Sequence, residues 1–164
     1  MTLDFFPADF LRVFLGLFGL LWGSFLNVVI HRVPRGMSVV SPPSHCTACQ
    51  APVKPWQNLP VVSYVLRGKT ACCGAKLSAR YPLVELIGGV LSLAIVELLV
   101  LPLPAATTTL AHAAAIYFSS FTLALGLVAT AFIDLEHMLV LPDTWNLVGA
   151  LLGVATASLR GLTI

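Results

Sequence analysis

The feature that most constrains this chain is a series of long apolar stretches. Residues 13–30 contain no charged side chain, and about 20 mainly apolar residues are enough for a helix to cross a bilayer. Similar stretches cover about 82–103, about 107–133 and about 142–160. Only 10% of the chain is charged, against about 25% in soluble domains. We therefore predict an all-α integral membrane protein with about four transmembrane helices embedded in a lipid bilayer.

Charge is distributed unevenly, and this predicts how the chain crosses the membrane. Residues 10–84 contain no Asp or Glu and hold eight of the nine basic residues. Short loops rich in Lys and Arg stay on the cytoplasmic side, so we expect residues 31–81 in the cytoplasm and the N-terminus outside. A basic patch for nucleic acid is the alternative, but membrane topology already explains the asymmetry. We expect no nucleic-acid partner.

The first apolar stretch, about 10–30, is predicted to remain as a membrane anchor. Acidic residues precede it, and no small-residue cleavage site follows it, unlike a secretory signal peptide. Gly16, Gly19, Gly23 and Asn27 recur at spacings of three and four, which places them near one face of a helix. Small residues in this pattern let another helix approach closely. Helix packing is the first interpretation, and the lining of a substrate groove is the second.

Residues 31–81 form a different kind of sequence, rich in proline and containing all four cysteines. We predict three parts: a transmembrane helix over 1–30, a small cytoplasmic domain over 31–81 and a membrane domain over 82–164. A domain of about 50 residues often needs a metal or disulfides to fold. Disulfides are not expected in the reducing cytoplasm.

The cysteines have a spacing typical of a metal site. Cys46 and Cys49 form a Cys-x-x-Cys pair, and Cys72 and Cys73 follow as neighbours. Four thiolates of this kind hold Zn²⁺ tetrahedrally. We predict a zinc site from these four residues, with His45 as an alternative fourth ligand. Free thiols in a metal-free domain remain the other interpretation.

Carboxylates near the end of the third apolar stretch are the candidate catalytic groups. Asp134, Glu136 and Asp143 lie within eleven residues, 133–143, and carboxylates at a membrane boundary are functional by default. The topology places Asp134 at the cytoplasmic face. Asp143 follows Pro142 and is a plausible helix N-cap, in a supporting role. Glu85 is expected in the first turn of the second span, where the helix dipole favours it; a direct functional role is the alternative.

Several segments together resemble the type IV prepilin peptidase family, membrane-embedded aspartic peptidases that also N-methylate the processed pilin. The resemblance covers nearly the whole chain and lies in residues 23–34 (GSFLNVVIHRVP), 46–49 (CTAC), 56–64 (WQNLPVVSY), 73–74 (CG), 78–85 (SARYPLVE) and 133–143 (IDLEHMLVLPD). It implies a multi-pass protein of the bacterial inner membrane that cleaves prepilins or pseudopilins of type IV pili or type II secretion.

The resemblance also implies roles for particular residues. Asp134 matches the first of the family's two catalytic aspartates. S-adenosylmethionine is the implied methyl donor, and Glu85 is a candidate for its site. Thr70 stands where the family's third zinc cysteine is expected. The second aspartate belongs to a Gly-x-Gly-Asp motif in a later helix, but no Gly-Asp dipeptide occurs here, so the chain resembles a member truncated at its C-terminal side.

The chemistry of an aspartic peptidase needs both carboxylates. Two neighbouring carboxyl groups share one proton, since both cannot ionise at close range. The ionised group takes a proton from water, and the other polarises the scissile carbonyl. Asp134 supplies one of these states, and the spacing of Glu136 and Asp143 does not establish either as its partner. The alternative function is therefore an inactive relative, a zinc-containing membrane protein that binds or assembles pilins.

Overall fold

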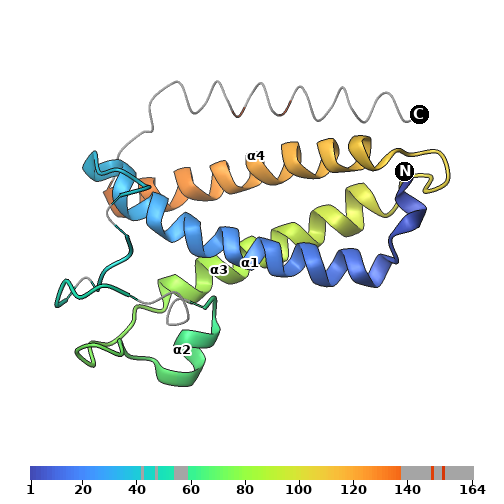
Figure 1. Cartoon of the computed structure of the whole chain (residues 1–164). Helices are drawn as coiled ribbons and strands as arrows, with labels where there is room; N and C mark the ends of the chain where they lie inside the picture. The colour runs from blue at the N-terminus through green and yellow to red at the C-terminus, as the bar shows by residue number, and fades with distance from the viewer. Residues whose placement is uncertain (42, 47, 54–58, 138–148, 150–152, 154–164) are drawn as a thin grey trace.

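The computed structural model describes residues 1–41, 43–46, 48–53, 59–137, 149 and 153. These residues are mostly helical and contain no strand. Helices α1 (Ala8–Arg32), α3 (Arg80–Ile95) and α4 (Leu110–His137) run side by side (Figure 1), and α3 continues as a π-helical turn, η4 (Val96–Val100). Short elements complete the chain: η1 (Leu3–Phe5), η2 (Val33–Arg35) and α2 (Val62–Arg67).

Three helices are long and apolar enough to cross a membrane, over Ala8–Arg35, Arg80–Val100 and Leu110–Glu136. They match the first three predicted spans. The predicted fourth span lies outside the described residues except for Gly149 and Gly153, and it stays a prediction. Helix α4 also extends beyond the predicted boundary at residue 133, so Asp134 belongs to its last turn.

Helices α1 and α3 cross at backbone contact. A Cβ atom added to Gly19 would lie 2.5 Å from Cβ of Ser92 and 2.6 Å from the carbonyl oxygen of Gly88. A Cβ atom on Gly23 would lie 2.7 Å from Cα of Glu85. All three distances are shorter than real Cβ contacts, so only glycine fits at both positions. This confirms the interpretation of the glycine face as a helix-packing surface.

One buried hydroxyl group joins the three long helices. Ser92 on α3 has no exposed surface, and its Oγ donates to the carbonyl oxygen of Leu15 on α1 at 2.5 Å. The hydroxyl of Tyr117 on α4 lies 2.6 Å from the same Oγ. Because the single proton of Ser92 goes to Leu15, Tyr117 donates to Ser92. The network satisfies the polar groups that a membrane interior cannot solvate.

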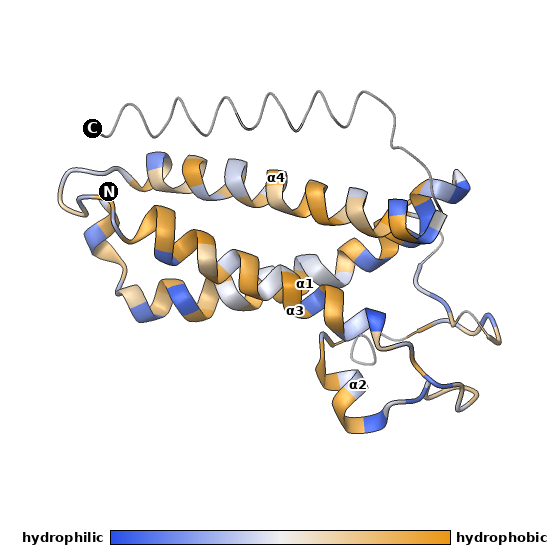
Figure 2. Cartoon of the chain, turned by 180° about the vertical axis from the view of Figure 1, so that it is seen from behind, coloured by the Kyte–Doolittle hydropathy of each residue, from blue (hydrophilic) through white to orange (hydrophobic). Residues whose placement is uncertain are grey.

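The outer surface of the bundle is apolar, as a bilayer requires. Figure 2 shows hydrophobic residues around all three long helices. Exposed apolar patches of this extent are rare on soluble monomers, and lipid covers them without cost. Large exposed hydrophobic side chains occur on α1, α3, η4 and α4: Phe14, Leu17, Leu21, Trp22, Phe25, Leu83, Val90, Leu98, Phe118, Leu127 and Leu135.

The bundle has two different ends. At the amino-terminal end, residues 1–9 meet the α3–α4 loop, where the Leu3 N–H donates to the Thr108 carbonyl at 3.0 Å. There Arg12 pairs with Glu97 at 2.5 Å. At the cysteine end lie the described parts of the segment 33–79, the start of α3 and the last turn of α4 (Figure 1). The candidate functional residues belong to the cysteine end.

Candidate functional site

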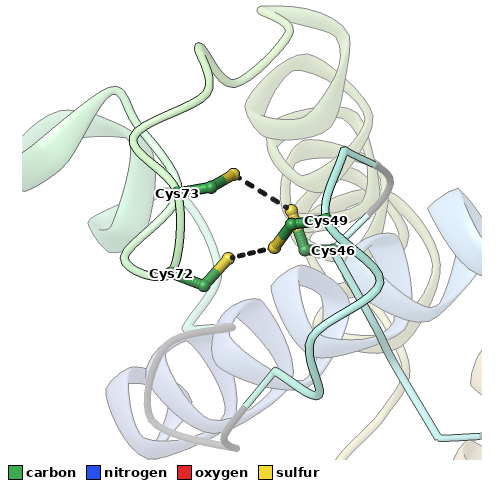
Figure 3. Close-up of side chains that lie close together, drawn as sticks. All are labelled: Cys46, Cys49, Cys72 and Cys73. Atoms are coloured by element: carbon green, nitrogen blue, oxygen red, sulfur yellow. Dashed lines mark hydrogen bonds between the residues drawn. The ribbon is translucent and has the colours of Figure 1, made fainter.

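The four cysteines come together at the cysteine end. Their sulfur atoms all lie within 4.8 Å of one another, with Cys46 and Cys73 3.8 Å apart and Cys49 and Cys72 3.3 Å apart (Figure 3). Four sulfurs around zinc at about 2.3 Å are separated by about 3.8 Å. The cluster could therefore hold a metal ion with small shifts. His45 is not part of it, and its Nδ1 lies 3.3 Å from the Pro43 carbonyl oxygen.

The first cysteine pair lies in a tight turn, here called the first knuckle (residues 45–52). The Cys46 N–H donates to the Ala51 carbonyl at 2.8 Å, and the Gln50 N–H donates to the Cys46 carbonyl at 2.9 Å. Gln50 has a φ of 59°, a left-handed conformation that is uncommon outside glycine. An isolated bridge between His45 and Pro52 closes the turn.

The second knuckle (residues 69–76) repeats this hydrogen-bond pattern. The Thr70 N–H donates to the Ala75 carbonyl at 2.8 Å, and the Gly74 N–H donates to the Thr70 carbonyl at 3.0 Å. Gly74 has a φ of 72°, and Lys69 and Lys76 form the closing bridge. The two knuckles therefore share one backbone design.

Overlaying the two patterns explains the irregular cysteine spacing. Thr70 takes the place of Cys46, and Cys73 takes the place of Cys49. Cys72 corresponds to Ala48 and supplies its sulfur from within the turn. The hydroxyl of Thr70 lies 3.3 Å from the Cys73 sulfur, so it lies beside the cluster. Sequence spacing alone does not show that the neighbouring cysteines both reach it.

Hydrogen bonds within the knuckles favour the ionised form of two of the thiols. The N–H groups of Cys49 and Ala48 lower the pKa of Cys46 to about 6. The Thr70 hydroxyl, followed by the Ala75 N–H, lowers the pKa of Cys73. The pKa of Cys49 rises to about 12: the Ala51 N–H favours its thiolate, but the neighbouring sulfurs and burial oppose a further charge. A bound cation would remove that opposition, since metal ligands must be deprotonated.

A cavity of about 460 Å³ lies between the knuckles, α2 and the ends of α1 and α3. Glu85 lines it and is only 8% exposed. Its Oε2 accepts the backbone N–H of Val61 at 2.7 Å. Glu85 lies beyond the first turn of α3, which contains no acidic residue. The predicted helix-dipole role is therefore wrong, because the helix begins at Arg80.

The backbone that reaches Glu85 is strained. Val61 has φ 58° and ψ −43°, and the Val62 N–H donates back to the Pro60 carbonyl at 2.5 Å. This is a γ-turn of the rare, strained kind, adopted here by a β-branched residue. Strain of this type concentrates at functional sites. Nothing in the sequence pattern identifies Val61.

Asn27 brings a second polar group to the cavity wall. It is 3% exposed, and its Nδ2 donates to the Tyr81 carbonyl at 3.1 Å. Its Oδ1 is buried and has no hydrogen-bond partner within the part of the chain that the structure describes. Ser24, one turn earlier, also lines the cavity and hydrogen-bonds Glu85. Beyond the glycines, this face of α1 therefore lines a cavity at its end, and its role as a substrate groove stays a prediction.

Asp134 lies apart from the cavity but at the same end of the bundle. It is exposed on the last turn of α4 and does not line the cavity. Glu136, two residues later, forms an ion pair with Arg80, which does line it. The structure therefore connects the cavity wall to the helix end that carries Asp134. Asp143 lies outside the described residues.

Fold and site together define a multi-spanning membrane protein with a cysteine cluster and a buried carboxylate at one end. The family model described as Bacterial Peptidase A24 N-terminal domain matches residues 17–99, which include the cluster and Glu85. The chain belongs to the prepilin leader peptidase/N-methyltransferase family.

Individual relatives carry that same name. The protein from Myxococcus xanthus is 40% identical over 166 residues, covering 99% of this chain and 46% of the relative. The protein from Neisseria gonorrhoeae is 45% identical over 98 residues, covering 44% and 34%, and that from Klebsiella pneumoniae is 44% identical over 85 residues, covering 48% and 37%. The chain spans about a third to a half of the length of these curated relatives. No solved structure matches it.

Proposed function

We propose that this chain is part of a membrane aspartic endopeptidase that removes the basic leader from type IV prepilins or pseudopilins and N-methylates the new N-terminus. The observation that carries the proposal is the family match across residues 17–99, continued through Asp134 by the relative that covers 99% of the chain. Asp134, the cysteine cluster and the cavity all lie at the cysteine end, so both reactions have candidate groups there.

In this proposal Asp134 is one of the two catalytic carboxylates. Its exposed position on the last turn of α4 suits a substrate that reaches the membrane boundary from the side. A prepilin has a basic leader followed by an apolar helix, and their junction would lie at this boundary. Asp134 would hold or accept the proton that the dyad shares, and Asp143 would have a supporting role.

The resemblance implies that the second carboxylate belongs to a Gly-x-Gly-Asp motif, and this sequence contains no Gly-Asp dipeptide. We expect it in a Gly-x-Gly-Asp motif about 60 residues after Asp134, a distance that a loop and a span can supply. Sequencing the gene past Ile164 tests this expectation directly.

We assign the cysteine end to the cytoplasm of a bacterium whose inner membrane the helices cross. The basic residues of segment 33–79 support this orientation through the positive-inside rule. The cysteine cluster would bind Zn²⁺ in a structural role, because four thiolates leave no open coordination position. Metal binding would then stabilise a segment that has little core of its own.

Methylation requires S-adenosylmethionine, which would supply the methyl group to the new N-terminal amine. We assign Glu85 to its binding site. The buried carboxylate and the unpartnered Oδ1 of Asn27 fit a ligand that brings hydrogen-bond donors.

The peptidase proposal is tested by mass spectrometry of a prepilin-type substrate incubated with the chain alone and with the whole gene product. Asp134→Asn should reduce cleavage by at least about a hundredfold, the scale of losing a positioned acid–base group. Glu97→Gln, in η4 at the amino-terminal end of the bundle, is the control and should cleave normally. Cleavage that does not depend on Asp134 would contradict the proposal.

An inactive relative that binds pilins without cutting them is the second candidate. It predicts that neither the chain nor the whole gene product cleaves the substrate, while both retain it in a pull-down from detergent. Cleavage by the whole gene product would exclude this candidate.

A further inference from the structure

The cavity at the cysteine end has buried hydrogen-bond acceptors on one side and exposed cations on the other. Arg32 and Arg80 also line it, but Arg32 donates to the Ser38 and Pro43 carbonyls and Arg80 pairs with Glu136. At its inner end, Ser24 and Asn27 of α1 face Tyr81 and Glu85 of α3, as their mutual hydrogen bonds show. Glu85 and the Oδ1 of Asn27 are both acceptors in this buried region. A ligand group with several N–H donors would be complementary to these two acceptors.

Glu85 lacks a counter-ion in the protein. No cationic side chain forms an ion pair with it within the described ranges, although it is 8% exposed. Its bonds from Val61 N–H and Ser24 are both to neutral groups. A buried carboxylate without an opposite charge is costly, so a cationic group brought by a ligand would be bound strongly there.

The outer wall of the cavity is cationic. Arg67, Lys69 and Lys76 line it, are exposed and form no ion pair in the described part of the chain. Lys69 and Lys76 flank the second knuckle and would also offset the charge of the thiolates. Arg67, in the last turn of α2, does not flank a knuckle, so its charge is available to pair with an anionic group of a ligand.

A cavity with a carboxylate at its inner end and cations at its outer wall is complementary to a zwitterion. We propose that it binds the amino-acid end of S-adenosylmethionine, with the ammonium against Glu85 and Asn27 and the carboxylate near Arg67. This inference rests on the proposed methyltransferase function and adds the role of Arg67 and the orientation of the ligand in the cavity. The strained turn at Val61 is explained as well, because it directs a backbone N–H at the carboxylate that must stay ionised.

The amino-acid end is shared by S-adenosylmethionine and free methionine, so the test must separate the two sources. Binding to the purified chain in nanodiscs is measured by titration calorimetry with S-adenosylhomocysteine, methionine and methylthioadenosine. The last compound keeps the adenosine and the thioether but has no amino-acid end. We expect S-adenosylhomocysteine to bind at least about tenfold more tightly than either of the others.

Variants then locate the two charged ends. Glu85→Gln keeps a hydrogen-bond acceptor for the Val61 N–H and removes the charge; it should weaken S-adenosylhomocysteine binding about tenfold to a hundredfold, the scale of a charged hydrogen bond. Arg67→Gln should weaken it severalfold. Neither variant should change the already weak binding of methylthioadenosine. Glu97→Gln and Arg35→Gln, which lie outside the cavity, are the controls, and zinc content and thermal unfolding verify that every variant is folded.

Three results would overturn the inference: equal binding of methylthioadenosine and S-adenosylhomocysteine, tighter binding of free methionine, or unchanged binding in folded Glu85→Gln. A parallel assay of methyl transfer to a cleaved prepilin separates the two claims. Methyl transfer with binding that is insensitive to Glu85 leaves the proposed function standing and refutes this site. The absence of both methyl transfer and binding refutes both.

Discussion

The two ends of the bundle use polar residues in opposite ways. At the amino-terminal end, Arg12 and Glu97 pair where both side chains remain 41% and 46% exposed. At the cysteine end, Glu85 and Asn27 are almost completely buried; no ion pair to Glu85 is found within the described residues, and the Oδ1 of Asn27 has no hydrogen-bond partner there. Exposed pairs contribute little because water competes for them, whereas buried polar groups without partners are costly. The comparison supports the proposal that the cysteine end retains its polar groups for binding and not for stability.

The largest expected effect comes from breaking the helix crossing that supports the cysteine end. Gly23→Leu should unfold the α1–α3 pair, since even a Cβ atom would lie 2.7 Å from Cα of Glu85. We expect a destabilisation of more than about 4 kcal/mol, as for severe overpacking, measured by unfolding in mixed micelles. Gly126→Ala on α4 is the matched control because its Cβ would meet nothing within 4 Å. Similar losses in both variants would contradict the packing account.

The next largest effect tests the knuckles. Cys72→Ser should weaken zinc binding by at least about a hundredfold, because it removes a metal ligand. Loss of a residue that only hydrogen-bonds a ligand costs about tenfold to a hundredfold. Thr70→Cys should restore it in that background, because Thr70 occupies the backbone position equivalent to Cys46. Metal content after dialysis against a chelator measures both. Failure of Thr70→Cys to restore binding would show that the two knuckles are not equivalent.

A smaller effect is expected at the Ser92 network, midway between the two ends. Ser92→Ala removes a hydroxyl that contacts Leu15 at 2.5 Å and Tyr117 at 2.6 Å. Hydrogen bonds between membrane helices contribute about 0.6–2 kcal/mol, so we expect a loss of that order. Unfolding of Tyr117→Phe provides the companion measurement. Additive effects of the two substitutions would show that the hydroxyls act independently.

The smallest effect is expected at the amino-terminal end. Glu97→Gln removes the partner of an exposed arginine, which can still pair with Asp9 at 2.8 Å. We expect no measurable change in thermal unfolding, zinc content or ligand binding, at low or high salt. A clear loss of stability would mean that this ion pair is shielded by lipid, and the contrast between the two ends would weaken.

Much of the bundle could be predicted from the sequence, because membrane helices follow simple length and polarity rules. The apolar stretches gave three spans, and the spacing of Gly16, Gly19 and Gly23 gave the packing face of α1. The four cysteines were also identified correctly as one cluster. The role of Glu85 was harder, since the helix start at Arg80 could not be located within a turn, and that error changed its interpretation.

The sequence by itself determined which residue types are available and on which side of the membrane they are expected. Apolar length and basic charge act locally, so they can be recognised without tertiary contacts. Only the tertiary structure decided that Thr70 takes the backbone position equivalent to Cys46, that Val61 binds Glu85, 24 positions later in the chain, and that Arg80 connects the cavity wall to the end of α4. These contacts depend on how turns and helix ends meet in space, and no sequence period records that geometry.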